Sequence, residues 1–353
     1  MVDIVNSARI DVPIVVQQAL PNKQNLMRNG HRARQVANGF PAPPETLEEL
    51  VIPEEFQNVT MRDPNGGPNR DEVFVVHDSG PQTGNQRFFI FSCAFLLNFL
   101  QHSLNLFLDG TFKTVPNIAY QLLVIHGQHI GSRVTVPCAY VMLNGKSREM
   151  YEAALSVLKR LVNNVNPETA MMDFEIAFHQ AFNTVFPETY LSACFFHLCQ
   201  SIRRKISELG LTVAVRNDHQ LATSMAMFRA LAFVPLEFVE RAFVVLKAHL
   251  VETYSERDNY PAILAVSDYF EENYIGKKVR NRRNQPLFAR ELWNHVRHIE
   301  ADIYDLRAGK AISRPMSASW ARLQTRRTEL VEQFDHNDIL TFLRSMGGLL
   351  AAR

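Results

Sequence analysis

Apolar and polar positions in the first half of the chain follow a pattern that predicts a meander of three strands. Residues 104–108 form an apolar run of strand length. Residues 119–126 and 133–143 are rich in β-branched and aromatic side chains, and a short polar turn separates them. Because these runs follow one another closely, we expect the three strands to pair in sequential order.

The segments that follow alternate between helix and strand. Residues 147–162 carry apolar side chains at three- and four-residue steps, which predicts a helix. We then expect a strand at 170–173, a helix at 176–186, a strand at 190–196 and a helix at 198–209. This succession is typical of an α/β fold in which helices flank a mixed sheet.

From about residue 210 the apolar spacing becomes helical throughout. Residues 221–231, 235–254 and 261–274 all have apolar side chains at three- and four-residue steps, so we expect an all-helical region. Residues 1–45, by contrast, contain a basic stretch and end in a proline-rich segment. That composition indicates a flexible arm and linker.

Composition and charge limit the class of protein. At 353 residues, with 46% hydrophobic and 21% charged residues, the chain can form one large globular domain or two. The net charge of +1 provides no global basic field, so any nucleic-acid contact must come from local clusters. No apolar run approaches the ~18 residues that a membrane span requires, and the first residues do not resemble a signal peptide.

The cysteines predict no disulfide framework. The chain has four, Cys93, Cys138, Cys194 and Cys199, and they show no paired CxxC pattern. We therefore expect reduced thiols in an intracellular compartment.

Two aspartates end predicted strands and are candidates for metal ligands. Asp109 follows the first apolar run and precedes Gly110, so it either caps a turn or binds a ligand. Asp173 ends a second short apolar run in the same way. Two strand-end acids favour a single oxygen-lined site for Mg²⁺ or Mn²⁺, and a pair of such cations can clamp the attacking and leaving oxygens of a phosphodiester.

Five motifs in order resemble one family. They are Asp-Gly-Thr-Phe-Lys at 109–113, Tyr-Gln-Leu-Leu-Val-Ile-His at 120–126, Met-Asp-Phe-Glu-Ile-Ala at 172–177, Phe-Pro at 186–187, and Cys-Phe-Phe-His-Leu-Cys-Gln at 194–200. The sequence resembles the transposase domain of Mutator-like elements (MULE) from about residue 47 to residue 293. The resemblance implies a ribonuclease-H-like fold with an Asp, Asp, Glu metal site, interrupted by a helical insertion before the last acid.

The resemblance also organises the chain. It implies a pre-core segment at 46–103, a ribonuclease-H-like catalytic core at 104–210, a helical insertion at 211–290, and a diverged C-terminal helical part at 291–353. In the ribonuclease-H-like order the first and fourth strands lie side by side, so we expect Asp109 and Asp173 to be neighbours.

Cys194 and His197 form a Cys-x-x-His motif that the family carries beside its active site. The resemblance implies that His197 positions a phosphate or orders the metal site. Zinc is disfavoured, because a structural zinc site needs about four ligands and Cys199 would supply only a third. For Cys194 the alternative is a small buried apolar residue.

Two basic clusters are candidates for DNA contact. The first is on the predicted helix after His197, and the second is a run with five positive charges in seven positions. The candidate residues are Arg203, Arg204, Lys205, Lys277, Lys278, Arg280, Arg282 and Arg283. A solvated surface is the alternative for both clusters, and a nuclear import signal is a further alternative for the second.

The third acid of the family does not appear in its motif. The family has Asn-Asn-x-x-Glu just before a Trp; if Trp320 is that Trp, Ala318 stands in place of the Glu. Glu300 is the candidate substitute, with Asp302 nearby.

We therefore expect a nuclear, transposase-derived protein that binds DNA and carries out metal-dependent phosphodiester cleavage and strand transfer. If active it should form a homo-oligomer, and no small-molecule cofactor or membrane is expected. The alternative is a catalytically inactive descendant that acts as a DNA-binding or protein-interaction module.

Overall fold

The computed structural model describes residues 25, 28–30, 33, 44–62, 66–112, 115–129, 134–163, 165–280, 282–300 and 318–351. The chain divides into two compact units, Met1–Leu50 and Val51–Arg353. In the first unit, residues 44–50 form turns and bends, and the side chain of Leu47 is buried. Most of the expected flexible arm lies outside the described residues, and the predicted segment boundaries stay predictions.

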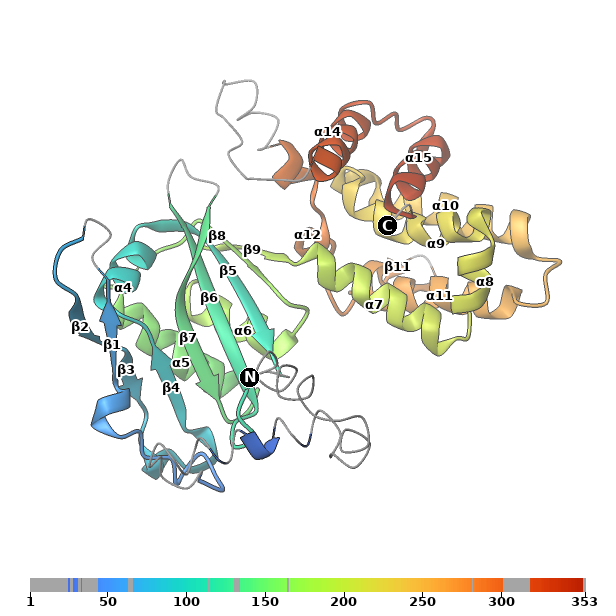
Figure 1. Ribbon diagram of the computed structural model, residues 1–353. Helices are drawn as coiled ribbons and strands as arrows, with labels where there is room; N and C mark the ends of the chain where they lie inside the picture. Colours follow the sequence, from blue (N-terminus) through green and yellow to red (C-terminus); the bar gives the residue numbers. More distant parts are fainter. Residues whose placement is uncertain are drawn as a thin grey trace, which may run out of the picture. The chain divides into compact units, whose positions relative to one another are not determined.

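A seven-stranded mixed sheet forms the first half of the second unit (Figure 1). Its order is β3-β4-β7-β6-β5-β8-β9. The strands are β3 (Val75–Asp78), β4 (Phe88–Phe91), β5 (Ser103–Thr111), β6 (Gln121–His129), β7 (Thr135–Leu143), β8 (Thr169–Met172) and β9 (Tyr190–Ala193). The predicted meander is confirmed, because β5, β6 and β7 pair antiparallel. The predicted neighbourhood of the first and fourth core strands is also confirmed, because β5 and β8 pair in parallel.

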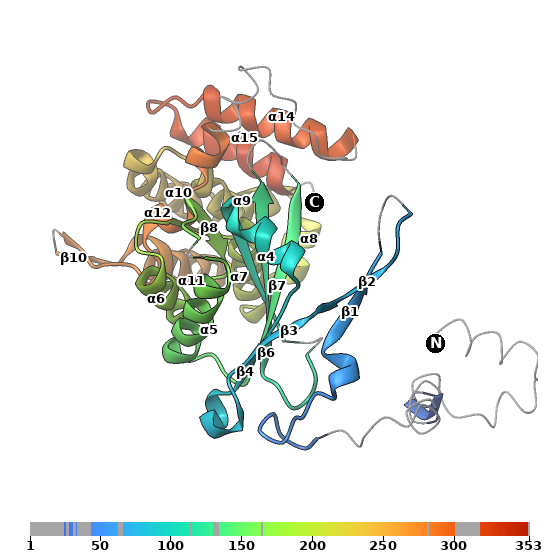
Figure 2. The ribbon, with the colours of Figure 1, turned by 90° about the vertical axis from the view of Figure 1, so that its left-hand side faces the viewer.

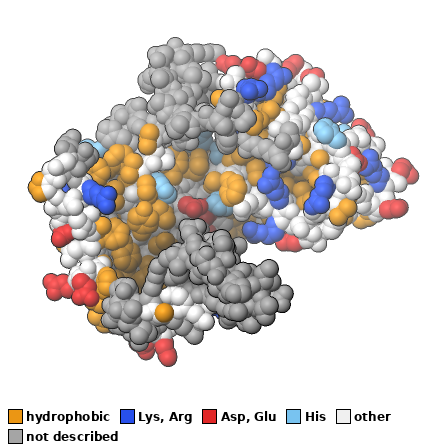
Figure 3. All heavy atoms as spheres, viewed as in Figure 1, with side chains coloured by type: hydrophobic (Ala, Val, Ile, Leu, Met, Phe, Trp, Pro, Cys, Tyr) orange, Lys and Arg blue, Asp and Glu red, His pale blue; other side chains and the backbone are white. Residues whose placement is uncertain are grey.

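One face of the sheet is covered by helices, and the opposite face is half-open. Helices α5 (Arg148–Leu161) and α6 (Ile176–Val185) lie on the covered face (Figures 1 and 2), and Ser147 caps α5 by accepting a hydrogen bond from the backbone N–H of Met150. Apolar side chains gather over the sheet on the face turned to the viewer in Figure 3. The side chains of β5, β6 and β8 that alternate with the buried core positions are partly buried or exposed.

The unit also contains a small hairpin and several short helices. Strands β1 (Asn58–Met61) and β2 (Arg70–Val73) form a separate antiparallel hairpin. Helix α4 (Ala94–Gln101) precedes β5. The short helical turns are η1 (Glu54–Phe56), η2 (Pro81–Gln86), η3 (Leu231–Phe233) and η4 (Leu236–Phe238).

The second half of the unit is helical and has its own hydrophobic core. Its helices are α7 (Phe195–Glu208), α8 (Thr212–Asn217), α9 (His219–Ala230), α10 (Val239–Tyr254), α11 (Tyr260–Phe270), the π-turn η5 (Glu271–Ile275), α12 (Arg290–Trp293), α14 (Ala318–Glu332) and α15 (Ile339–Ala351). Helices α9 and α15 approach closely at Gly347, where an added Cβ would lie 2.9 Å from Cγ of Met227. Among the described residues, no helix combines the length and the apolar character needed to cross a bilayer.

Two sequence-based expectations are wrong in detail. The strand expected at residues 190–196 ends at Ala193, because the carbonyl of Cys194 already accepts helical hydrogen bonds from His197 and Leu198. The region expected to be all-helical contains a small hairpin, β10 (Lys278–Val279) and β11 (Arg282–Arg283). Gly276, at φ +92°, ends the preceding helical turn and directs the chain into this hairpin.

Candidate metal centre

Asp109 and Asp173 meet because two parallel strands present them at the same edge of the sheet. Phe107 of β5 pairs with Met171 of β8, and each aspartate lies two residues further along its strand direction. A step of two residues keeps both side chains on the same face. The side-chain ligand atoms of Asp109, Asp173 and His197 all lie within 4.8 Å of one another. The expected proximity of the two acids is therefore confirmed.

His197 reaches this site from the first turn of α7. Its Nδ1 lies 2.8 Å from Oδ1 of Asp173, which is ion-pair distance. The two groups are poorly aligned for a hydrogen bond, since both of these buried atoms lack a partner of good geometry. The Asp173 carboxylate, with Cys194 as a second contributor, raises the pKa of His197 to about 10. In the protein alone, His197 is therefore a cation beside an acid.

The electrostatics of the three side chains fit a bound divalent cation. Burial, and then the charge of Asp173, raises the pKa of Asp109. The two carboxylates therefore repel each other, and His197 compensates only part of their charge. The two carboxylates offer oxygen ligands of the kind that a divalent cation prefers, and a bound cation would relieve their mutual repulsion.

A buried polar side chain borders the same space. Gln121 is only 3% exposed, and its Oε1 accepts a hydrogen bond of 2.6 Å from the hydroxyl of Tyr151. A Cβ added at Gly110 would lie 2.2 Å from Nε2 of Gln121 and 3.7 Å from Oδ2 of Asp173. The absence of a side chain at Gly110 therefore leaves a space that both the Gln121 amide and the Asp173 carboxylate border. The sequence carried one signal for this residue: Gln121 is a polar residue on the strand face that it shares with the apolar Leu123 and Ile125.

The backbone at Asp173 is held by helix α6. The ring Nε2 of His179 donates to the carbonyl oxygen of Asp173 at 2.5 Å, and the N–H of Glu175 donates to the same oxygen. Burial lowers the pKa of His179, so the ring is neutral and its proton is on Nε2. The sequence pattern did not single out His179.

The residues next to the site anchor it to the helical core. Phe174, beside Asp173, makes edge contacts with the rings of Tyr274 and Phe288 at centroid distances of 5.7 and 4.9 Å. Phe195, at the start of α7, packs on Phe233 at 4.9 Å. Each loop therefore presents a polar group to the site and an aromatic ring to the helical part.

Comparison with known proteins agrees with this arrangement. Residues 105–201 match the family model of the MULE transposase domain. The MULE domain contains Asp109, Asp173 and His197, and it implies a ribonuclease-H-like fold, with which the mixed α/β architecture is consistent. No curated protein matches the chain.

Among the described residues, the candidate metal group consists of Asp109, Asp173 and His197 and contains no cysteine. Cys194 is partly buried at the start of α7, and Cys199 is buried on the same helix. The group consists of two acids and a histidine, which differs from the cysteine-rich set of a structural zinc site.

The third acid is not among the residues that meet at this site. Glu300 is exposed and lies outside the three-residue group, as does Glu291. Asp302 and Asp305 lie outside the described residues, and Ala318 is the first residue of α14. The catalytic role expected of Glu300 stays a prediction without a contact to support it.

The predicted basic residues differ in their surroundings. Arg203 and Arg204 are exposed on α7, whereas Lys205 pairs with Glu208 at 3.5 Å. Lys277 pairs with Glu272 at 3.1 Å. The other exposed cations of the second cluster are Lys278, Arg280 and Arg282, all on the β10–β11 hairpin. Their DNA contacts stay predictions.

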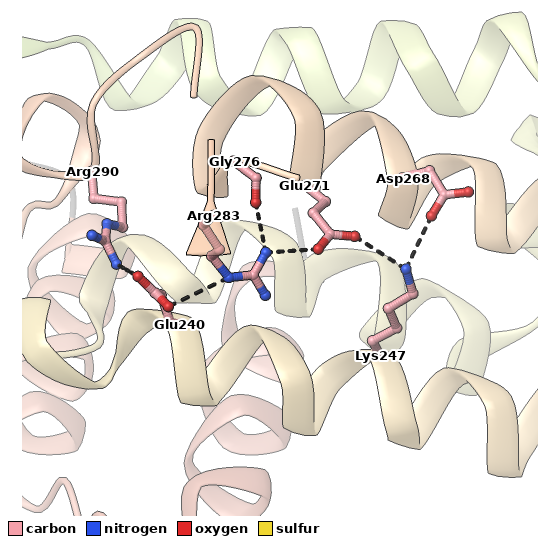
Figure 4. A network of polar contacts seen from close by, with 7 residues as sticks. All are labelled: Glu240, Lys247, Asp268, Glu271, Gly276, Arg283 and Arg290. Carbon is pink, nitrogen blue, oxygen red and sulfur yellow. Dashed lines mark hydrogen bonds and ion pairs between the residues drawn. The ribbon is translucent and has the colours of Figure 1, made fainter. Parts of the chain in front are cut away.

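Arg283 has a structural environment instead. Figure 4 shows its guanidinium between Glu271 and Glu240, at N–O distances of 2.7 and 3.4 Å. The same group donates to the carbonyl oxygen of Gly276 at 2.6 Å. These contacts hold the side chain at the base of the hairpin, and the DNA contact expected of Arg283 stays a prediction.

Proposed function

We propose that this chain is a transposase-derived DNA-processing protein of the Mutator-like type, with a ribonuclease-H-like core. In this proposal Asp109 and Asp173 hold Mg²⁺ or Mn²⁺, and the reaction is phosphodiester cleavage followed by strand transfer. The observation that carries the proposal is the convergence of Asp109, Asp173 and His197 at the ends of neighbouring parallel strands inside the MULE domain.

Each side chain has a distinct part in this proposal. A divalent cation at the site would polarise the phosphodiester and lower the pKa of an attacking hydroxyl or water. Asp109 and Asp173 supply oxygens to hold it. His197, a cation beside Asp173, would attract a phosphate oxygen toward the first turn of α7.

The proposed partner is DNA, bound in the nucleus by a homo-oligomer. A transposase domain implies DNA binding. Arg203 and Arg204 on α7, together with the hairpin cations Lys278, Arg280 and Arg282, are the exposed charges proposed to contact phosphates. The proposal requires no small-molecule cofactor.

The second candidate function is that of an inactive descendant that binds DNA or protein without cleaving. It is favoured by one observation: the third member of the site within the described residues is a histidine, not an acid. Loss of one electrostatic stabiliser typically costs ~10²–10³ in rate.

The deciding experiment is cleavage of a duplex DNA in Mg²⁺ and in Mn²⁺ by the full chain. Activity that disappears in Asp109→Asn and Asp173→Asn, and is retained in the exposed control Asp258→Asn, would support the enzyme. Inactivity of the unaltered chain together with activity in Ala318→Glu would identify a degenerate enzyme. Loss of activity in Glu300→Ala alone would assign the third acid to Glu300, and metal-independent binding without cleavage in every variant would select the inactive descendant.

A further inference from the structure

Two exposed aromatic rings lie where β5 ends and β6 begins. Phe112 is 51% exposed and Tyr120 is 43% exposed, and their rings meet edge to face at a centroid distance of 5.6 Å. Phe112 directly follows β5 and Tyr120 directly precedes β6, where Thr111 pairs with Leu122. Exposed aromatic pairs of this kind usually mark a binding surface, because each ring loses favourable burial until it is covered.

A lysine completes this cluster. The Nζ of Lys146 lies 5.8 Å from the centroid of the Tyr120 ring. The backbone N–H of Tyr120 donates to the carbonyl oxygen of Leu143 at 2.9 Å, which ties the ring's position to β7. The cluster of Phe112, Tyr120 and Lys146 therefore combines a fixed ring, a second ring and a cation.

The cluster adjoins the acids through its immediate neighbours. Tyr120 precedes Gln121, whose amide borders the space over Gly110 that Oδ2 of Asp173 also borders. Phe112 is three residues beyond Asp109 on the same segment. Three residues of extended chain span about 10 Å, so Phe112 and Asp109 lie within the span of a short DNA strand.

We propose that Phe112, Tyr120 and Lys146 form a subsite for one unpaired DNA base and its phosphate, next to the scissile bond. The inference rests on the proposed function in that the substrate is DNA, and it goes further by requiring an unpaired nucleotide. Aromatic side chains stack on the π-face of any base, so the subsite would be tolerant of sequence.

The chemistry favours an unpaired base over the other occupants. In a duplex, neighbouring base pairs cover both faces of each base, so the rings would find no face to stack on. An apolar protein segment would cover the rings but would leave Lys146 without a partner for its charge. An unpaired nucleotide satisfies both, with its base on the rings and its phosphate at the ammonium group.

The test compares the affinity of the full chain for a blunt duplex and for the same duplex with three unpaired 3′ nucleotides. Fluorescence anisotropy in EDTA prevents cleavage from affecting the measurement. The unaltered chain should bind the tailed duplex about 5- to 100-fold more tightly, the gain of about one stacked base. Phe112→Ala and Tyr120→Ala should abolish this preference without changing the affinity for the blunt duplex, and Tyr120→Phe should keep it.

Two further variants sharpen the comparison. Lys146→Gln should lower the salt slope of binding to the tailed duplex by about 0.7, the contribution of one single-strand phosphate. Phe95→Ala is the matched control, because Phe95 is 56% exposed but lies on α4. Helix α4 leads into the first residue of β5, whereas Phe112 follows the last residue of that strand. It should behave as the unaltered chain does.

Three outcomes would overturn the inference. Equal affinity for the two duplexes, or a preference that persists in both alanine variants, would reject the subsite and leave the proposed function intact. A preference lost equally in Phe95→Ala would show a general effect of surface apolar residues and would reject it also. Absence of binding to either duplex would reject the proposed function, and the subsite with it.

Discussion

At the scale of single residues, Gly110 leaves the room that the Gln121 amide occupies. A methyl group at this position would overlap Nε2 of Gln121, and the Tyr151 hydrogen bond restricts how far Gln121 can move away. We expect Gly110→Ala to lower the free energy of unfolding by about 1–3 kcal/mol, the usual cost of overpacking. Thermal denaturation measures this change. Gly145→Ala is the control, since its nearest contact would be an ordinary 3.7 Å, and equal stability of the two variants would contradict the described position of Gln121.

The metal-binding residues make a prediction that does not depend on activity. A cation that binds only the folded chain stabilises it, by about 2.7 kcal/mol at a concentration of 100 Kd. We expect Mn²⁺ to raise the thermal midpoint of the unaltered chain, EDTA to reverse the rise, and Asp173→Asn to abolish it. If Mn²⁺ raised the thermal midpoint of Asp173→Asn and of Asp109→Asn as much as that of the unaltered chain, the cation would bind elsewhere.

His295 predicts a dependence of stability on pH. Burial, and then the charges of His298 and Arg327, lowers its pKa to about 3 from the ordinary histidine value of 6.5. Between these values the unfolded chain binds a proton that the folded chain does not, so stability falls as the pH drops below 6.5. The slope is at most about 1.4 kcal/mol per pH unit. We expect denaturant titrations of His295→Phe to show a smaller loss between about pH 6.5 and pH 5; an identical loss would mean that other groups dominate.

At the scale of elements, the β10–β11 hairpin shows how ion pairs hold a segment too short to be stable alone. Arg283 links Glu271 of the π-turn to Glu240 of α10, and Arg290 pairs with the same Glu240. Lys247 extends the network to Asp268 and Glu271 (Figure 4). Because Arg283 and Glu271 are largely shielded from solvent, their contact should contribute more than a surface ion pair.

This network predicts different effects for two adjacent arginines. Arg283→Met would leave Glu271 short of a partner, and we expect it to cost about 1–3 kcal/mol of stability and to speed tryptic cleavage in the hairpin. Arg282→Met, on the exposed neighbour, should change stability by less than about 0.5 kcal/mol. Equal melting temperatures and equal proteolysis rates for the two variants would show that Arg283 does not anchor the hairpin.

At the scale of the whole molecule, a net charge of +1 means that DNA affinity must depend on a few local cations. We expect the variant in which Lys278, Arg280 and Arg282 are replaced by glutamine to reduce the salt slope of duplex binding by about 2.7, or about 0.9 for each lost phosphate contact. Arg326→Gln, at an exposed ion pair on α14, is the control and should leave the slope unchanged. An unaltered slope in the triple variant would remove the hairpin from the DNA interface.

Local periodicity in the sequence was sufficient to predict most of the sheet and its helices. Strands and helices differ in apolar repeat, two residues against three to four, so the meander, α5 and α6 could be recognised from short windows. The two acids could be recognised because each interrupts an apolar run at a strand end. The hairpin of β10 and β11 could not, since its four residues carry no apolar period and its place depends on Gly276 and Arg283.

The sequence by itself therefore determined the order of the core elements and the two strand-end carboxylates, because these follow from side chains within a few residues of one another. Only the tertiary structure decided that His197 faces Asp173, that Gln121 borders the same acid across Gly110, and that Arg283 is held by Glu240 and Glu271. Those choices depend on contacts between segments far apart in the chain. A charged side chain pairs with whichever groups lie within a few ångströms of it after folding, and a local sequence pattern does not predict those distances.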